Sequence, residues 1–357
     1  MKTGTVRAHA VVRFGTAHEA QRLIAGVPVA ARILRELARA GFNEAWIDVA
    51  SGETIGAPVM AEIHRLAATT VVHIIAPPAS VEAKLFPADQ LIAAEAIPDF
   101  LAGKPYPFTL LSPPGATARI LRGTGKATDG IVSRWFNRPV SRRLSALLLR
   151  VPAIKPIHAT VGTALIAVAM AATLVFGGRS GLVVGALLFH GASVFDGVDG
   201  EMARATFRTS RAGAALDSAI DAATNVAAML GLAINLALRG ESDALPLVTW
   251  GLALLLIGLT MIGRRSFRES GSISFDGVKD SYRGRFSHPV AKRLMALATL
   301  GTSRDFCALL YVVLVLAGIP IAGLYLFAAA TPVWIVFVSA ALWRSRESRP
   351  AVIEGTA

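Results

Sequence analysis

Long apolar runs in the C-terminal half constrain the fold of this 357-residue chain more than any other feature. Residues 306–343 include no charged side chain. A helix of about 20 apolar residues crosses a hydrocarbon core of about 30 Å, so this run is too long for one crossing. Gly318 and Pro320 provide a turn within it. The chain as a whole is 54% hydrophobic, which is typical of a membrane protein.

The apolar runs predict six membrane-spanning helices within residues 156–346. Two of them share the run just described, and the other four are expected at residues 157–176, 181–195, 213–238 and 245–263. Basic residues gather in the loops on one side, which the positive-inside rule assigns to the cytoplasm together with both termini. The predicted location is therefore the inner (cell) membrane. The net charge of +12 indicates contact with lipid headgroups or phosphorylated substrates, and nucleic acid is not expected as a partner.

Four aspartates lie beside or inside two of these apolar segments. Asp196 and Asp199 are at i,i+3 spacing, and Asp217 and Asp221 are at i,i+4, so each pair occupies one helical face. A carboxylate in hydrocarbon costs a few kcal/mol, and such residues are usually functional. If the two helices are neighbours, the four carboxylates converge and repel one another unless divalent cations lie between them. Two metals that share carboxylates can hold the attacking and leaving oxygens of a phosphoryl displacement.

The pattern D-x2-D-G-x2-A-R-x8-G-x3-D-x3-D over residues 196–221 resembles the signature of the CDP-alcohol phosphotransferase (CDP-alcohol phosphatidyltransferase) family. All of its signature positions are present. The resemblance implies a homodimeric membrane enzyme of phospholipid or phosphodiester biosynthesis. Such an enzyme transfers a substituted phosphoryl group from a CDP-linked alcohol to an acceptor hydroxyl and releases CMP.

The same resemblance implies the roles of individual residues. The metal, Mg²⁺ or Mn²⁺ and two per active site, would be held by Asp196, Asp199, Asp217 and Asp221, with Asp221 also the catalytic base. The CDP group would be bound by Asp199, Gly200, Ala203, Arg204, Gly213 and Asp217. Three arginines at the expected cytoplasmic helix ends are candidates for binding a phosphate of the acceptor: Arg264, Arg265 and Arg304.

Residues 1–118 predict a separate soluble α/β domain in the cytoplasm. Strands are expected at 8–14, 44–50 and 70–76, with helices at 27–40 and 57–67 between them, which favours a mostly parallel sheet. Residues 26–42 resemble a segment of the sugar-phosphate nucleotidyltransferases.

The loop that follows the first strand departs from that resemblance. Between residues 13 and 22 it holds one glycine, Gly15, where an active nucleotidyltransferase has a glycine-rich phosphate loop. We therefore predict that this domain is inactive and that its role is structural or regulatory.

Residues 119–155 are rich in arginine interleaved with large apolar residues. They predict an amphipathic helix in the cytoplasmic interface, divided in two at Pro139. Residues 347–357 are expected to form a cytoplasmic tail. Beside the motif, Glu201 is expected to be solvated and Ser193 to be a packing residue, and His158, His190 and His288 show no ligand spacing.

Three alternatives stay open at this point. The donor is either CDP-diacylglycerol or a CDP-linked polar alcohol of the CDP-inositol type, and the acceptor is an alcohol or a phospho-alcohol. A cation-binding transporter would also place aspartates in a membrane, but it predicts carboxylates spread over the membrane depth. A catalytically inactive scaffold predicts a broken set of carboxylates, whereas this set is complete.

Overall fold

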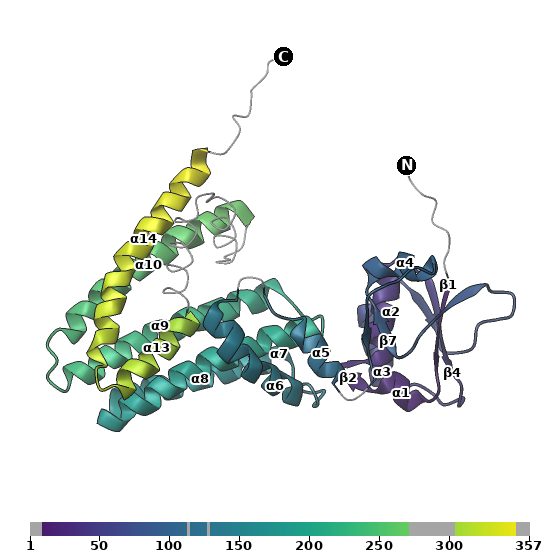
Figure 1. Ribbon diagram of the computed structural model, residues 1–357, viewed down its shortest axis with the longest axis horizontal. Coiled ribbons are helices and arrows are strands. Elements are labelled where there is room, and N and C mark those ends of the chain that lie inside the picture. The colour runs from purple at the N-terminus through teal and green to yellow at the C-terminus, as the bar shows by residue number, and fades with distance from the viewer. Residues whose placement is uncertain (1–8, 113–114, 127–128, 271–303, 348–357) are drawn as a thin grey trace, which may run out of the picture. The chain divides into compact units, whose positions relative to one another are not determined.

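The computed structural model describes residues 9–112, 115–126, 129–270 and 304–347 (Figure 1). The chain forms two compact units. One comprises residues 1–125, 142–155 and 201–208, and the other comprises residues 126–141, 156–200 and 209–357. The expected C-terminal tail, His288 and most of the basic residues between Arg264 and Arg304 lie outside the described residues.

The N-terminal α/β domain is built on a parallel sheet with the strand order β5-β4-β1-β6. Its strands are β1 (His9–Phe14), β4 (Glu44–Val49), β5 (Val71–His73) and β6 (Ala83–Phe86). All three strand pairs are parallel, and β1 and β4 run in register from His9 opposite Glu44. This confirms the parallel α/β domain predicted from the sequence, while strand β6 was not predicted.

Two helices connect the strands of this sheet. Helix α2 (Val29–Arg39) joins β1 to β4, and α3 (Ala57–Leu66) joins β4 to β5. Phe14, Leu34 and Ile63 are fully buried where the helices meet the sheet. The smaller elements of the domain are α1 (Ala17–Gln21), β2 (Leu23–Ile24), β3 (Val27–Pro28), β7 (Gln90–Ile92), η1 (Ala94–Ala96), α4 (Ile97–Leu101), β8 (Phe108–Leu110) and α5 (Ala116–Arg122).

Four helices in the described chain are long and apolar enough to cross a membrane. They are α7 (Pro156–Phe176), α8 (Gly178–Ala205), α9 (Arg211–Ala237) and α10 (Ala244–Ser270), the last counted over residues 244–265. Helices α13 (Arg304–Leu316) and α14 (Ile321–Glu347) flank the turn expected near Gly318, which has a positive φ of 78°. These two helices do not meet the same criterion over the described residues, so the structure supports a multi-pass helical membrane protein without confirming six spans.

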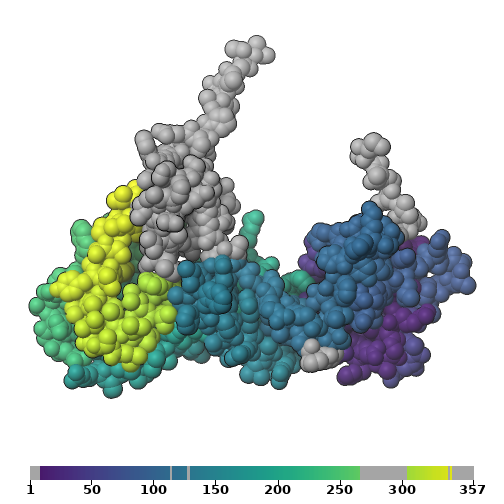
Figure 2. All heavy atoms as spheres, in the orientation of Figure 1, coloured from purple at the N-terminus to yellow at the C-terminus, as the bar shows by residue number. Residues whose placement is uncertain are grey.

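Close helix contacts hold the membrane unit together. Helix α7 packs on α9, and α10 packs on α9 and α14. The pair α10 and α14 is visible as neighbouring green and yellow helices in Figure 1, and Figure 2 shows yellow atoms of α14 at the surface. Glycines permit the approach around Leu174 of α7, because a Cβ at Gly185 of α8 would lie 2.4 Å from its side chain and one at Gly231 of α9 would lie 2.9 Å away. Large apolar side chains such as Phe176, which is 85% exposed, face outward, as expected for helices that meet lipid.

In the basic segment before α7, the helix is continuous across Pro139. A π-helical turn, η2 (Ser133–Asn137), passes directly into α6 (Arg138–Leu148). Pro139 therefore does not divide the helix. Its ring would clash with the carbonyl four residues earlier in a regular α-helix, and the wider π turn placed just before it relieves that conflict. Trp135 is 72% exposed on this turn, whereas Asn137 is buried.

Candidate active site

The two halves of the aspartate motif lie on α8 and α9. Helix α8 does not end at residue 195 but continues through Asp196 and Asp199 to Ala205. Helix α9 begins at Arg211, and the Oγ of the N-cap residue Ser210 accepts a hydrogen bond of 3.0 Å from the N–H of Gly213. A Cβ at position 213 would lie 3.0 Å from that Oγ, so glycine at this motif position leaves room for the cap.

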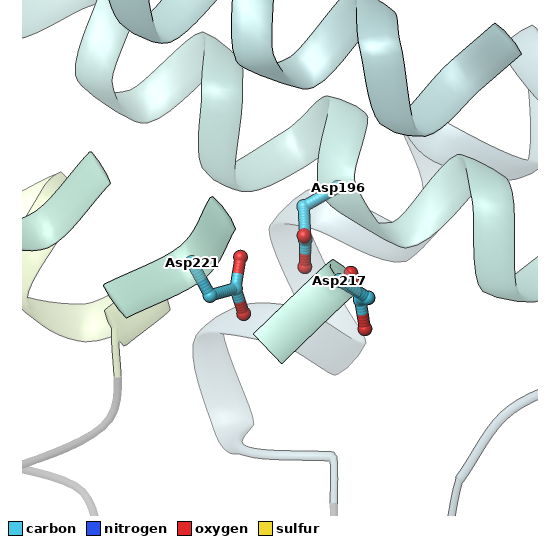
Figure 3. A group of neighbouring side chains, drawn as sticks. All are labelled: Asp196, Asp217 and Asp221. Carbon is cyan, nitrogen blue, oxygen red and sulfur yellow. The ribbon is translucent and has the colours of Figure 1, made fainter. Parts of the chain in front are cut away.

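Three of the predicted metal ligands come together between the two helices. One carboxylate oxygen from each of Asp196, Asp217 and Asp221 lies within 4.8 Å of the others, and all three residues are half-buried. Figure 3 shows Asp196 pointing from α8 into the space between the other two side chains on α9. A set of carboxylate oxygens fits a hard divalent cation such as Mg²⁺ or Mn²⁺.

The fourth aspartate, Asp199, occupies a different environment. It is buried, and its Oδ2 accepts a hydrogen bond of 2.5 Å from the Oγ1 of Thr160 on α7. It is not one of the three residues in the tight cluster, although it lies within the electrostatic reach of Asp217. The four predicted ligands are therefore arranged as a group of three with Asp199 held from the side by α7.

A basic side chain meets the acidic cluster. Arg304, the first residue of α13, places its Nη1 3.2 Å from Oδ1 of Asp196 and also pairs with Asp221. Its side chain is 11% exposed. Sequence analysis predicted Arg304 as a ligand for an acceptor phosphate, and here it balances the charge of two carboxylates. Of the other two candidates, Arg264 is exposed and Arg265 half-buried on α10.

The start of α13 is anchored by a polar network that sequence analysis missed. The Oδ1 of Asp305 accepts hydrogen bonds from Ser193 Oγ at 2.6 Å and from Asn137 Nδ2 at 2.9 Å. Ser193 lies one turn before Asp196 on α8. It was expected to be a packing residue, but its hydroxyl also links α8 to α13 through Asp305. The available signal was an aspartate next to an arginine at the start of an uncharged run, a costly place for a carboxylate without partners.

A second missed residue, Arg138, supports the motif from the basic segment. Its guanidinium donates to both carboxylate oxygens of Asp129, at 2.9 and 2.8 Å, and to the carbonyl oxygen of Gly197 at 3.4 Å. A Cβ at position 197 would lie 3.1 Å from its Nη1. Arg138 is thus buried and paired within the protein, although the segment was expected to lie in the cytoplasmic interface.

The last turns of α8 carry Ala203 and Arg204, two predicted CDP-binding residues. The Nε of Arg204 donates a hydrogen bond of 2.6 Å to the carbonyl of Thr124. The expectation that Glu201 is solvated was wrong, because its side chain is fully buried and accepts a hydrogen bond of 2.7 Å from Ser145. The helix continues past the motif, and α6 covers the face on which Glu201 lies.

The loop after β1 in the α/β domain uses the chain's own carboxylates to satisfy its backbone amides. The N–H of Gly15 donates to Glu19 at 2.9 Å, and the N–H of Ala17 donates to Glu53 at 2.8 Å. In a phosphate loop such amides are the groups that bind the anion. Two carboxylates occupy them here, so a bound phosphate would have to displace both.

Comparison with known proteins agrees with the geometry of the membrane unit. Residues 155–316 match the model of the family CDP-alcohol phosphatidyltransferase. The chain is similar to a "Bifunctional IPC transferase and DIPP synthase" of Thermococcus kodakarensis, at 31% identity over 52% of this chain and 36% of that protein. It is similar to a protein of the same name in Aquifex aeolicus, at 31% identity over 54% of this chain and 40% of that protein.

These matches span well under half of each relative's length. The motif, the carboxylate cluster and the match to residues 155–316 nevertheless agree on the same helices. The region that matches the CDP-alcohol phosphatidyltransferase family, residues 155–316, is therefore the region that holds the motif and the carboxylate cluster.

Proposed function

We propose that this protein is a metal-dependent membrane transferase. It moves a substituted phosphoryl group from a CDP-linked alcohol to an acceptor hydroxyl and releases CMP. The observation that carries the proposal is the convergence of Asp196, Asp217 and Asp221 within 4.8 Å, inside the region that matches the family. A scattered set of carboxylates, as in an ion pathway, would not meet at one point.

The carboxylates have a defined task in this reaction. Asp196, Asp217 and Asp221 would hold the divalent cations, with Asp199 oriented by Thr160 beside them. When bound, the metal neutralises the pyrophosphate and makes CMP a better leaving group. Gly200, Ala203, Arg204 and Gly213 would complete the binding of the CDP group.

Proton transfer is assigned to Asp221. The acceptor hydroxyl oxygen attacks the phosphorus of the substituted phosphate, and the bond from that phosphorus to the oxygen of CMP breaks. The hydroxyl proton passes to the Asp221 carboxylate, directly or through one water, and CMP leaves with the electron pair of the broken bond. Arg304 pairs with Asp221 in the structure, so it must release this carboxylate or share it during the reaction.

The α/β domain and the relatives favour one substrate class. The two relatives carry the name DIPP synthase, and the N-terminal domain resembles nucleotidyltransferases that would produce a CDP-linked polar alcohol. We infer a donor of the CDP-inositol type ahead of CDP-diacylglycerol, with an alcohol or phospho-alcohol as acceptor. The N-terminal domain itself is proposed to lack cytidylyltransferase activity, because Glu19 and Glu53 occupy the amides of its loop.

The membrane arrangement is proposed on the same grounds. We propose six spanning helices within residues 156–346, a juxtamembrane segment at 119–155, both termini in the cytoplasm and a homodimer in the inner membrane. Helices α13 and α14 would be the fifth and sixth spans. Exposed apolar residues on the described helices, and the short turn between these two helices, support this arrangement.

Acceptor-dependent release of CMP tests the proposal. The purified full chain is given Mg²⁺ or Mn²⁺ with CDP-inositol or CDP-diacylglycerol, each with a panel of alcohols and phospho-alcohols, and Asp221→Asn is run beside it. We expect CMP release with one donor class that requires both metal and acceptor and that is lost in the variant. Folded, metal-binding protein that releases no CMP with any pair would favour the inactive scaffold. Metal-dependent ion flux in liposomes without CMP release would favour a transporter.

A further inference from the structure

The C-terminal end of α8 adopts a tight cap with an unusual residue at its centre. The N–H of Arg208 bonds to the carbonyl of Ala203 at 2.8 Å, and the N–H of Phe207 bonds to that of Arg204 at 3.4 Å. This is the Schellman pattern, in which the left-handed position is usually glycine. Here it is Phe207, with a φ of 56°. A side chain tolerates this conformation only where its surroundings impose it.

Residues 201–208 belong to the same compact unit as residues 1–125, and that unit supplies the surroundings. Three arginines of α2 and α3, here called the arginine clamp, surround the cap: Arg32, Arg35 and Arg65. The ring of Phe207 lies beneath two of them, with 3.7 Å from its centroid to the guanidinium carbon of Arg35 and 5.2 Å to that of Arg32. These are cation–π distances, so the ring has a specific reason to occupy its position.

The arginine clamp also binds the terminal carbonyls of the helix. Arg32 donates to the carbonyl of Ala205 at 2.9 Å, and Arg65 donates to those of Thr206 at 2.9 Å and Phe207 at 3.2 Å. The last carbonyls of a helix have no partner within the helix and carry the negative end of its dipole. The carbonyls of Ala205 and Thr206, and that of Phe207 just beyond the helix, thus accept hydrogen bonds from cations in a different part of the sequence.

Arg32, the most deeply buried residue of the clamp, remains charged at neutral pH. Burial lowers the pKa of Arg32 to about 10, so its guanidinium is still a cation at neutral pH. Arg208 adds a further link through its ion pair with Glu62 of α3. The end of α8 is therefore held by several charged contacts that all come from helices α2 and α3.

We propose that the arginine clamp is a positioning device for the end of α8. It holds Ala203 and Arg204 in the geometry that binds the CDP group, and this gives the α/β domain a role without any catalysis of its own. The proposal rests on the proposed function. It assigns Arg32, Arg35, Arg65 and Phe207 as positioning residues, which act on the helix end rather than on the substrate.

The test uses a double variant, Arg35→Ala with Arg65→Ala, in the full chain. Arg32 is avoided because it is almost fully buried and its loss endangers folding. The matched control is Arg39→Ala on the same helix, since Arg39 donates to Glu36 and Glu95 and takes no part in the clamp. Two quantities are measured: hydrogen exchange of the amides of residues 203–208, and the binding of CMP in the presence of Mg²⁺.

The double variant should exchange these amides faster and bind CMP at least about tenfold more weakly, since small displacements of binding groups are costly. In turnover, the KM for the CDP-linked donor should rise while kcat changes by less than about threefold, because the clamp acts before chemistry. The control should match the wild type in all of these measurements. Faster exchange with unchanged CMP affinity and donor KM would overturn the proposal and leave the clamp as a stabilising contact alone.

A second variant separates the ring from the backbone. In Phe207→Gly, the new glycine adopts the positive φ of this position easily, but the ring beneath the guanidinium groups is lost. We expect weaker CMP binding, as in the double variant, and unaltered CMP affinity in Phe207→Gly would contradict the proposal. Wild-type protein that binds no CMP would instead contradict the proposed function, so the two failures are distinguishable.

Discussion

The acidic cluster of the membrane unit and the loop after β1 of the α/β domain differ in how their carboxylates are paired. In the cluster, Asp196, Asp217 and Asp221 gather acceptor oxygens around a space where Arg304 supplies one positive group. In the loop, the carboxylates of Glu19 and Glu53 accept hydrogen bonds from backbone N–H groups. The first arrangement suits a cation and, through it, a pyrophosphate.

The second arrangement is satisfied without any ligand. The resemblance to CDP-alcohol phosphotransferases is therefore matched by a suitable site in the membrane unit. The resemblance of the α/β domain to nucleotidyltransferases is not matched by a free phosphate loop. A phosphate site needs hydrogen-bond donors that are free to bind the ligand. In this loop the N–H groups of Gly15 and Ala17 already donate to carboxylates. Substitutions in the cluster should therefore reduce CMP release far more than substitutions in the loop.

Loss of a carboxylate from the cluster should have the largest effect. Asp217→Asn removes one charged side chain, on α9, from the cluster between α8 and α9. We expect CMP release to fall by at least about 10²–10³-fold. The assay follows CMP from the full chain at saturating donor. Asp243→Asn is the control, because Asp243 lies on the exposed loop before α10 and pairs with Tyr325. Nearly full activity in Asp217→Asn would mean that the cluster is not the reacting centre.

Removal of Arg304 should separate metal binding from turnover. Without its cation, Asp196 and Asp221 attract a divalent metal more strongly, and Arg304→Gln should tighten Mn²⁺ binding about tenfold. Turnover should fall, since the variant loses a cation beside the reacting phosphates. Mn²⁺ titration followed by electron paramagnetic resonance measures the affinity. Weaker Mn²⁺ binding in the variant would show that Arg304 organises the cluster instead of competing with metal.

The hydroxyl of Thr160 should matter less than the cluster itself. It donates to Asp199, and loss of such an outer hydrogen bond typically costs about 10–100-fold in metal affinity or activity. Thr160→Val keeps the shape of the side chain and tests this with the same Mn²⁺ titration. Thr173→Val is the matched control on α7, where the hydroxyl donates to the carbonyl of Met170 within its own helix. Equal Mn²⁺ affinities in both variants would remove Asp199 from the metal site.

The loop of the α/β domain should give the smallest effect. Glu53→Ala leaves the N–H of Ala17 without its partner and should lower stability by about 1 kcal/mol, with no change in CMP release. Thermal unfolding measures the first quantity and the transferase assay the second. Neither this variant nor the wild type is expected to bind CTP at this loop. Saturable CTP binding by the wild type, lost on mutation of loop residues, would show that the loop still binds a nucleotide.

Local pattern predicted much of this fold. The alternation of strands and helices predicted the parallel sheet, because three of its four strands, β1, β4 and β5, carry their own periodicity and turn signals, whereas β6 does not. Hydropathy gave the four long helices, since their length follows from the thickness of a bilayer. The pairing of Asp196 with Asp217 and Asp221 followed from helical spacing once the two helices were taken as neighbours.

What the sequence did not reveal depends on contacts between distant residues. Glu201 reads as a solvated acid beside a motif, yet Ser145 of the basic segment buries it. Pro139 reads as a helix break, yet a π turn accommodates it. Phe207 carries no local signal at all, because its left-handed conformation is set by arginines more than 140 positions earlier in the chain. Such features need the tertiary structure.

Crystals of the full chain with Mn²⁺ and CMP would locate the metal by its anomalous scattering. We expect Mn²⁺ bound by the carboxylates of Asp196, Asp217 and Asp221, with the phosphate of CMP beside it and Arg304 turned away from Asp221. Mn²⁺ bound elsewhere, with Arg304 still paired to these carboxylates beside bound CMP, would contradict it.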